Sequence, residues 1–455
     1  MISEIHLSGQ KKKKQEAREE LARNYDPKSR IEKHKLLELC GNICLQKIAA
    51  KVAGAQPLTF EEAMVGMSHV IAATNKRVFE ILRKPLERGR KVPFGRDEAI
   101  ACGASFLTAM AMREALVDLT PEEVAGIATA GLIDTIIRLP LLHVIETCGM
   151  GGDPGFHHNG TTWKTINAST LSSIVLASLG LPVIKHGSYA NTSVMGSTET
   201  IEMFGANTTM RSEEEIMRIW EACKYCYLDA HLTKTLHDLS HLLLIETINH
   251  IVGPMSLPVS PDTEVTKLMG VNEKIHPSII ARAYTLLHRR GIQKMGGVAI
   301  VAGLDESGFN IDPANFDHVR DHTTVDELSP FASVVSLAHQ GTFLGNFLVT
   351  PEDFGVELNP NAVQIPNEKE TIHLANMRAI RGEDIALTDY LAMNAALGLF
   401  AERHLGVDDD AVTDEGVNCD YLRQCTEECR EAIQSGAAWR KLVEYVETSG
   451  GKIAV

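Results

Sequence analysis

The chain has 455 residues, of which 44% are hydrophobic and 23% charged, the balance of a soluble globular protein with room for two or three domains. Its formal net charge of −15 disfavours general nucleic-acid binding, and no segment is long and apolar enough to predict a membrane span or an export signal. The odd number of cysteines, nine, indicates reduced thiols and a cytoplasmic location rather than a disulfide framework.

The first third of the chain is predicted to be helical. Residues 1–36 are charged and aperiodic and include the basic run Lys11–Lys14, so we expect a solvated helix or a loosely attached extension. Residues 37–142 follow as a helical domain, which a later helical segment could join. Helix starts in this domain are marked by Thr59 with a glutamate three positions on, and by Thr120 ahead of a proline.

The pattern changes at His143. The strand HVIETCG (143–149), the helix ASTLSSIVLASLG (168–180) and the strand PVIKHG (182–187) form a βαβ unit, so the two strands are parallel with a right-handed crossover. A further helix and strand, 277–291 and 297–303, repeat this arrangement. The sequence therefore predicts an α/β domain over residues 143–455 with a central, mostly parallel sheet.

Three groups of polar residues follow predicted strands, which is where ligands bind in open parallel sheets. The first group is the glycine run Gly149–Asp153 together with the helix start at Thr165–Thr170. Glycines allow an anion to approach closely, and a helix N-terminus offers free N–H groups, to which Asn167, Ser169 and Thr170 add side-chain donors. A plain turn followed by an ordinary helix cap is the alternative interpretation.

The second group is Lys185–Ser188, where a lysine beside glycine and hydroxyl groups suits phosphate or pyrophosphate; a solvated loop is the alternative. The third group is the adjacent pair Asp305 and Glu306. Two neighbouring carboxylates repel unless a cation lies between them, and Mg²⁺ is commonly held by one or two carboxylates together with substrate phosphates. Solvated surface acids are the alternative at this position.

Six stretches in collinear order resemble the anthranilate phosphoribosyltransferase family, part of a wider group that includes the pyrimidine nucleoside phosphorylases: GMGGD, TINAST, IKHGSYANTS, GSTETIEMFG, GLDE and LVTPEDFGV. The likeness runs from about residue 58 to 450. It implies a small N-terminal all-helical domain, a large α/β domain with the substrate cleft between the two, and a homodimer. The implied reaction is a magnesium-dependent transfer of the 5-phosphoribosyl group from phosphoribosyl pyrophosphate (PRPP) to the nitrogen of an aromatic amine or N-heterocycle. Pyrophosphate leaves, and no covalent intermediate forms on the enzyme.

Carried over position by position, the resemblance implies three sets of site residues. PRPP would be bound by Gly149, Gly152, Asp153, Thr165, Asn167, Ser169, Thr170, Lys185, His186, Gly187, Ser193 and Ser197. Magnesium would be held by Ser169, Asp305 and Glu306, and the catalytic residues would be Lys185, Asp305 and Glu306. The acceptor would lie against Gly149, His186, Ser188, Tyr189 and Ser240.

The chain departs from the family pattern at the acceptor positions. Ser188 and Tyr189 stand where the family has Asn-Arg, and Ser240 stands where it has an arginine that would hold the anthranilate carboxylate. Losing this bidentate partner predicts an acceptor other than anthranilate. His237 and His241, four residues apart on an expected helix, are candidates to replace the arginine or to bind a metal.

A further departure is the insertion 154–164 (PGFHHNGTTWK), which splits the glycine motif and could either cover or obstruct the PRPP site. Two other functions stay open. One is a nucleoside phosphorylase that uses inorganic phosphate, which the adjacent acids disfavour. The other is a non-catalytic relative that binds a ligand or nucleic acid, which the acidic net charge disfavours despite the Lys11–Lys14 run. PRPP, Mg²⁺ and a small aromatic or heterocyclic acceptor are therefore the predicted ligands.

Overall fold

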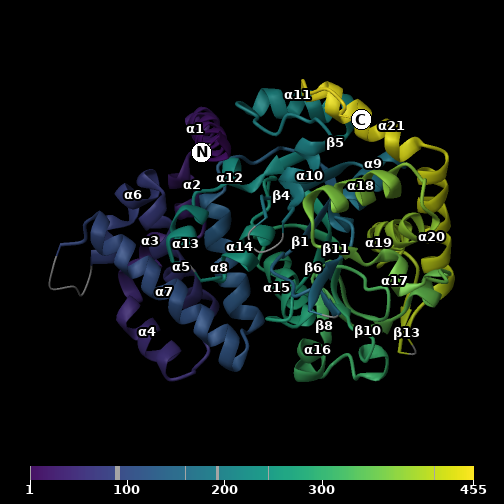
Figure 1. Cartoon of the computed structure of the whole chain (residues 1–455). Coiled ribbons are helices and arrows are strands. Elements are labelled where there is room, and N and C mark those ends of the chain that lie inside the picture. The colour runs from purple at the N-terminus through teal and green to yellow at the C-terminus, as the bar shows by residue number, and fades with distance from the viewer. Residues whose placement is uncertain are drawn as a thin grey trace. The chain divides into compact units, whose positions relative to one another are not determined.

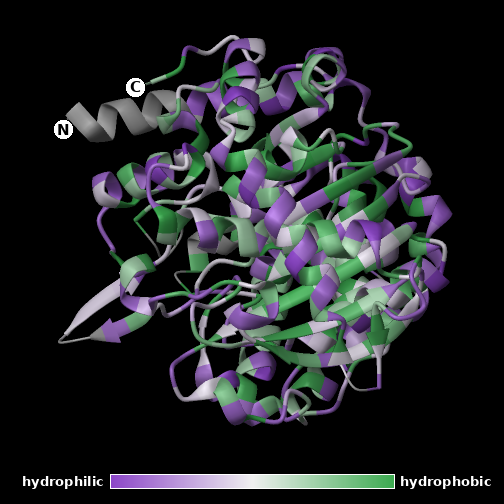
Figure 2. Cartoon of the chain, turned by 90° about the vertical axis from the view of Figure 1, so that its right-hand side faces the viewer, coloured by the Kyte–Doolittle hydropathy of each residue, from purple (hydrophilic) through white to green (hydrophobic). Residues whose placement is uncertain are grey.

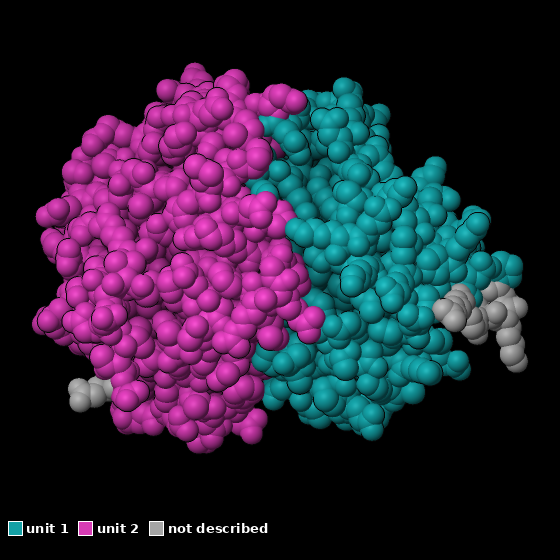
Figure 3. Space-filling model, turned by 180° about the vertical axis from the view of Figure 1, so that it is seen from behind, with its two compact units in different colours: residues 1–139, 211–213, 230–260 teal, residues 140–210, 214–229, 261–455 magenta. Residues whose placement is uncertain are grey.

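The structure is a computed structural model that describes residues 2–87, 93–158, 160–190, 194–243, 245–414 and 416–454, with the backbone alone for residues 2–11, 158 and 240–242. The chain divides into two compact units, which Figure 3 shows in different colours. Unit 1 comprises residues 1–139, 211–213 and 230–260, and unit 2 comprises residues 140–210, 214–229 and 261–455.

The described secondary structure of unit 1 is helical apart from an isolated β-bridge between Leu139 and Val259. The two predicted helix starts are confirmed, since the hydroxyls of Thr59 and Thr120 each accept a backbone N–H at 3.2 Å while the glutamate three residues on returns a bond to the cap. Helix α5 packs against both α7 and α8. The helices of the unit are α1 (Ile2–Leu21), α2 (Pro27–Lys33), α3 (Leu36–Asn42), α4 (Leu45–Ala53), α5 (Phe60–Thr74), α6 (Lys76–Glu87), α7 (Arg96–Val117), α8 (Pro121–Asp134), α12 (Ala230–Thr233), α13 (His237–Leu243) and α14 (Asn249–Met255).

The N-terminal segment is helical, as one of the two expected alternatives had it, but its described part is not loosely attached. Ala17, Leu21 and Ile31 are buried, and the Arg18 guanidinium lies 2.8 Å from the carboxylate of Asp238 on α13. These contacts make the described side chains of residues 12–36 part of the packed helical unit. The unit ends at residue 139, three residues before the expected boundary, and the later segment 230–260 belongs to it.

Helix α7 corrects the expectation that no segment could span a membrane. By length and composition alone it is apolar enough to do so, and it is the one such helix among the described residues. This is weak evidence, because packed helices of globular proteins pass the same test. In unit 1 the helix buries Phe106, Leu107 and Met110, and its Arg113 forms an ion pair with Glu123 of α8 at 2.7 Å.

Unit 2 is built around a twisted sheet with the strand order β10-β9-β7-β6-β1-β4-β5, to which β8 is added beside β7. The neighbours from β7 through β5 are parallel, whereas β8, β9 and β10 pair in antiparallel fashion. Its strands are β1 (His143–Gly149), β4 (Val183–Gly187), β5 (Tyr225–Asp229), β6 (Glu264–Gly270), β7 (Met295–Leu304), β8 (Thr323–Val325), β9 (Ser333–His339) and β10 (Thr342–Val349).

The central strands are buried and mainly apolar, as parallel strands covered on both faces are, with Glu146 of β1 and Lys267 of β6 buried as an ion pair. All ten residues of β7 and all five of β5 are buried, and the strands at the centre of the sheet are largely green in Figure 2. Helices α9 and α19 pack on central strands, and α15 packs on β7 and β9. The helices of unit 2, several of which are labelled in Figure 1, are α9 (Ala168–Ser178), α10 (Ser197–Met203), α11 (Glu213–Cys223), α15 (Pro277–Arg289), α16 (Phe316–His322), α17 (Pro360–Val363), α18 (Lys369–Ile380), α19 (Ile385–Arg403), α20 (Cys419–Gln434) and α21 (Ala437–Thr448).

The predicted fold class is confirmed: a helical N-terminal part is joined to a large α/β part with a central, mostly parallel sheet. The insertion 154–164 forms an antiparallel hairpin of β2 (Phe156–His158) and β3 (Thr161–Lys164). Strand β3 also pairs with β11 (Ile365–Pro366), so the hairpin belongs to a small second sheet. A two-stranded ribbon, β12 (Val412–Thr413) and β13 (Gly416–Val417), precedes α20.

Candidate functional site

The site lies at the carboxyl edge of the parallel strands of unit 2. Gly149, the last residue of β1, pairs with Gly270, the last residue of β6, and Lys185 on β4 pairs with Thr147 on the other side of β1. Parallel strands all end at the same edge, so the loops that follow β1, β4 and β6 meet there. The first two predicted groups, the glycine run and the Lys185–Ser188 loop, are thus brought together by the sheet.

The glycine loop after β1 is held in one shape by side chains from other parts of the sheet edge. Gly151 and Gly152 both have positive φ, 72° and 74°, which glycine adopts at little cost. The Gly151 N–H donates to the Asp326 carboxylate at 2.6 Å, and the Asn272 side-chain amide donates to the Gly151 carbonyl at 2.8 Å. Since these bonds fix Gly151 from both sides, the loop is pre-shaped.

The second half of the motif begins helix α9, and its first residues have partners on other elements. Asn167 is the N-cap residue, and its backbone N–H donates to the side chain of Asn376 on α18 at 2.9 Å. The Thr165 hydroxyl donates to the Glu327 carboxylate, and the Thr170 hydroxyl donates to Ser197 at 3.0 Å. The start of α9, with the positive end of its helix dipole, therefore faces the same edge as the glycine loop.

An acid pair that the sequence analysis did not select, Asp326 and Glu327, lies within this site. It follows β8, which runs antiparallel to β7 and pairs Val325 with Gly303. This reversal returns the chain to the glycine loop, where a Cβ on Gly149 would collide with the Asp326 carboxylate. The absence of a side chain at Gly149 is what admits Asp326.

The environment of Asp326 and Glu327 disfavours the ionised form of both carboxyl groups in the absence of a cation. Burial and the nearby Asp153 carboxylate raise the pKa of Asp326 to about 6, with the Gly151 N–H acting against them. Burial and the charge of Asp326 raise the pKa of Glu327 well above its usual range. Concentrated carboxylate charge with a partly accessible surface is an environment that a divalent cation stabilises.

Lys185 supplies a positive charge at the same edge. Its side chain is fully buried, and its ammonium group donates to the His186 carbonyl at 2.9 Å. Burial lowers the Lys185 pKa to about 8, and the nearby Cys148 and Asp326 partly oppose that shift. Lys185 is therefore protonated near neutral pH and within electrostatic reach of the acid pair.

The remainder of the second loop is tied down by α10 and β5. A Cβ on Gly187 would lie 2.6 Å from the Ser197 Cβ, so only glycine fits there. The Ser188 hydroxyl donates to the Tyr189 carbonyl at 3.0 Å, and the Tyr189 hydroxyl donates to the Glu202 carboxylate at 2.8 Å. His186 is buried on β4. Tyr189, which stands at the family's arginine position, thus lies beside a carboxylate.

The structure does not bring the predicted pair Asp305 and Glu306 to the glycine loop. The Asp305 carboxylate lies 3.0 Å from the His322 ring nitrogen and accepts the Ser307 N–H at 2.8 Å, and Glu306 is exposed. A sequence signal for the other pair existed in the stretch TTVDELSP (323–330), where two adjacent acids follow a β-branched run. The strand before them has only three residues, so it escapes a search for long apolar strands.

The other predicted residues are distributed as follows. Gly152 and Asp153 lie in the glycine loop, and the Ser169 carbonyl accepts a bond from the Thr147 hydroxyl at 2.8 Å in the first turn of α9. Ser193 lies outside the described residues. Ser240 belongs to α13 of unit 1, and its side chain, like that of His241, is outside the described part of the structure.

Comparison with known proteins agrees with this architecture. Residues 142–312 match the family described as "Glycosyl transferase family, a/b domain". The matched range includes strands β1 and β4–β7 of unit 2 and also the segment 230–260 of unit 1. Among relatives, the chain is 28% identical to an anthranilate phosphoribosyltransferase of Methanococcus vannielii over 345 residues, 74% of this chain and 88% of that one. It is 27% identical to that of Caldivirga maquilingensis over 288 residues, 61% of this chain and 73% of the relative. The chain is thus similar to anthranilate phosphoribosyltransferases over most of the length of these relatives.

Solved structures agree at the level of the fold. The anthranilate phosphoribosyltransferase of Thermus thermophilus superposes with a TM-score of 0.59 at 21% identity, covering 88% of this chain and 99% of that one. The Saccharomyces cerevisiae protein, solved in complex with PRPP and Mg, gives 0.59 at 20% identity, covering 89% and 98%.

Proposed function

We propose that this chain is a magnesium-dependent phosphoribosyltransferase that moves the 5-phosphoribosyl group of PRPP to the nitrogen of an aromatic amine or N-heterocycle and releases pyrophosphate. The observation that carries the proposal is the contact between Gly151 and Asp326, because it joins the anion-binding glycine loop to the acid pair. The relatives named anthranilate phosphoribosyltransferase, and the yeast protein crystallised with PRPP and Mg, support the same reaction class.

The residues at the site fit a magnesium ion. The available donors are carboxylate and hydroxyl oxygens, which hard cations prefer. Among the described residues no three His, Cys, Asp or Glu side chains cluster tightly enough to hold a metal by themselves. This agrees with a magnesium ion that takes part of its coordination from substrate phosphates. Asp326 and Glu327 would hold it, in place of the predicted Asp305 and Glu306, and when bound it would neutralise charge on the departing pyrophosphate.

The chain's own residues would then bind and orient the donor. The glycine loop and the first turn of α9 would receive the pyrophosphate, with the hydroxyl groups of Ser169, Thr170 and Ser197 beside them and the positive end of the helix dipole directed at the anion. Lys185 contributes a positive charge against the same anion. The acceptor nitrogen needs only to be held in line with the ribose carbon, so the reaction requires no nucleophilic residue of the protein.

We retain the sequence prediction that anthranilate is a poor acceptor. The Tyr189 hydroxyl is bonded to Glu202, and the Ala190 N–H donates to Glu199 at 3.1 Å. Two carboxylates beside the position where the family carries an arginine would repel an anionic acceptor. An uncharged amine or heterocycle suits this environment better, although anthranilate is the first compound to test because the relatives carry its name.

The test is calorimetric titration of PRPP with and without Mg²⁺. The wild type should bind PRPP only with Mg²⁺, and D326N/E327Q should weaken binding by about a hundredfold or more. The matched control D305N/E306Q changes the same two charges elsewhere in unit 2 and should stay within about threefold of wild type. If D305N/E306Q weakened PRPP binding more than D326N/E327Q, the cation site would instead be assigned to Asp305 and Glu306. Phosphate-dependent release of a base from nucleosides, without PRPP binding, would favour the phosphorylase instead.

A further inference from the structure

The inserted hairpin reaches the glycine loop through its last residue. Lys164 ends β3, and its ammonium group lies 2.6 Å from the Asp153 carboxylate and 2.6 Å from the Asp153 backbone carbonyl. The two side chains are only 12% and 14% exposed. One lysine therefore holds both the side chain and the backbone of the residue that ends the glycine run.

The local sequence is arranged to let this contact form. Gly155 has φ of 75°, and a Cβ there would lie 2.6 Å from the Trp163 carbonyl and 3.2 Å from Cδ and Cε of Lys164. The lysine side chain thus passes directly over a glycine. On the other side, the Gly155 N–H donates to the Thr324 carbonyl at 2.8 Å, two residues before the acid pair. The hairpin, the loop and the approach to Asp326 form one connected structure.

The charges of the site explain why such a lysine matters. Asp153, Asp326 and Glu327 place three carboxylates around the loop that would receive a pyrophosphate. Lys164 lies 2.6 Å from the Asp153 carboxylate and so compensates that charge beside the other two acids. Without Lys164, the Asp153 carboxylate would repel both the acid pair and the incoming pyrophosphate. Lys185 would then be the main cation opposing this repulsion.

We propose that Lys164 is a positioning residue for PRPP: it fixes Asp153 and cancels its charge, so that the inserted hairpin completes the phosphate-binding loop rather than obstructing it. The identity of the substrate rests on the proposed function, whereas the anchoring of Asp153 by Lys164 does not. Lys164 acts through Asp153 and does not need to touch the ribose. It should therefore affect donor binding rather than the chemical step.

The first measurement needs no substrate. Hydrogen exchange of the backbone amides in residues 149–156 should be faster by about tenfold in K164M than in wild type, because the loop loses its anchor. K164R keeps the charge and should restore most of the protection. The matched control is K294M, which removes another lysine–carboxylate pair, Lys294–Glu264 at 2.6 Å in the same unit, and should leave this peptide unchanged. Unchanged exchange in K164M would overturn the proposal.

The second measurement uses magnesium pyrophosphate and PRPP as calorimetric probes. K164M should raise the Kd of both by about tenfold while kcat at saturating PRPP stays within about twofold, and K164R should recover most of the affinity. The decisive variant is K164M/D153N. If Lys164 acts by compensating Asp153, the double variant binds more tightly than K164M. If it binds no better, compensation of the Asp153 charge by Lys164 is refuted.

These outcomes separate this inference from the proposed function. If the wild type binds neither probe, the phosphoribosyltransferase proposal fails while the exchange measurement still decides whether Lys164 anchors the loop. If the wild type binds both probes and K164M binds them equally well with a normal melting temperature, the reaction class stands and the role of Lys164 is excluded.

Discussion

Asn376 and Asn167 hydrogen-bond each other twice. The Asn376 side-chain oxygen accepts the Asn167 backbone N–H at 2.9 Å, and its amide nitrogen donates to the Asn167 side-chain oxygen at 2.8 Å. Asn376 lies on α18 and is fully buried. Residue 376 thereby fixes the N-cap of α9, at the helix end that faces the glycine loop.

We predict that N376L destabilises the protein by about 1–3 kcal/mol, because two partly buried polar groups of Asn167 lose their partners. PRPP binding should weaken as well, since the first turn of α9 loses its orientation. The control N315A removes an ordinary helix cap on α16, whose side chain accepts the His318 N–H at 3.1 Å, and should cost about 1 kcal/mol. Denaturant unfolding and calorimetry measure both effects. Equal losses of unfolding free energy and of PRPP affinity in N376L and N315A would contradict the prediction.

The fold was predictable where the signals are local. A strand that ends in glycine and is followed by a helix cap, as at Gly149 and Asn167, identifies itself within a few residues, and the parallel arrangement follows from the βαβ rule. The glycine loop and the Lys185 loop were found in this way. A later helical segment was expected as a possible part of the helical unit, but no local signal identified residues 230–260 as that segment.

The acid pair shows why local signals fail. Asp305 follows a long buried strand and was therefore selected, but β8 reverses the chain and carries Asp326 back to Gly149 instead. That reversal depends on the antiparallel pairing of a three-residue strand with β7. The partners Asn376, Asn272 and Lys164 were missed for a related reason, since each is identified by what it contacts rather than by its neighbours in sequence.

The pKa of Lys185 predicts how donor binding depends on pH. Burial lowers this pKa to about 8, so the ammonium form falls as the pH rises through 8. The protonated form attracts the PRPP anion, and PRPP affinity should therefore decline above pH 8, by up to about tenfold for each further pH unit. K185M should bind weakly and should lack this limb. Titrations between pH 6.5 and 9.5 measure it, and a wild-type Kd that is flat across this range would rule out Lys185 as the responsible group.

The exposed face of α7 predicts how copies of the chain associate. Met112 and Leu116 are 59% and 73% exposed on a helix with few charges, and Ile100 is 41% exposed. Met112 and Leu116, one turn apart, form an exposed apolar patch of the kind found at interfaces, and the family resemblance implies a homodimer. M112E/L116E should shift the protein from dimer to monomer in light scattering. The control I385E changes an isolated residue of unit 2 that is 79% exposed and should leave the dimer intact. A wild-type monomer at micromolar concentration would contradict the prediction.

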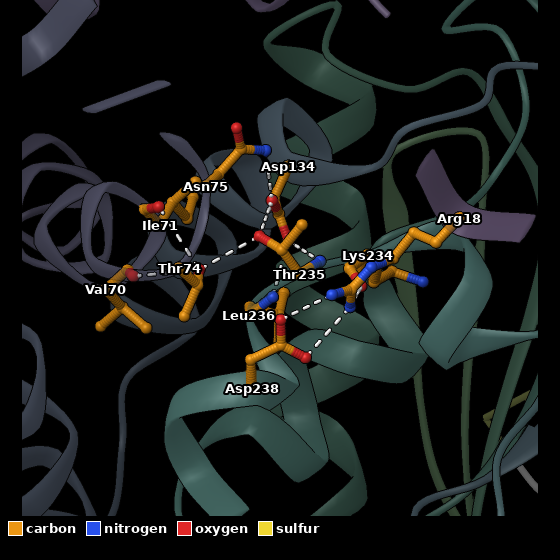
Figure 4. Close-up of polar contacts among 10 residues, drawn as sticks. All are labelled: Arg18, Val70, Ile71, Thr74, Asn75, Asp134, Lys234, Thr235, Leu236 and Asp238. Atoms are coloured by element: carbon orange, nitrogen blue, oxygen red, sulfur yellow. Dashed lines mark hydrogen bonds and ion pairs between the residues drawn. The ribbon is translucent and has the colours of Figure 1, made fainter. Parts of the chain in front are cut away.

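Asp134, the last residue of α8, is the position of unit 1 that we expect to be most sensitive to substitution (Figure 4). Its buried carboxylate accepts the backbone N–H groups of Thr235 and Leu236 at 2.7 and 2.9 Å, the Thr235 hydroxyl at 2.6 Å and the Asn75 amide at 3.0 Å. Because D134A leaves these donors buried without an acceptor, it should lower the free energy of unfolding by about 3–5 kcal/mol.

The Arg18–Asp238 pair in the same view provides the comparison. Its side chains are 19% and 44% exposed, so solvent screens the ion pair and R18Q should cost less than about 1 kcal/mol. The two variants remove polar contacts to the same short segment, residues 234–238. D134A removes contacts from α8, and R18Q removes contacts from α1. The urea midpoint of D134A should therefore lie well below that of R18Q. The R18Q midpoint should stay close to that of wild type. Equal losses would mean that the N-terminal helix, rather than the buried aspartate, fixes this segment.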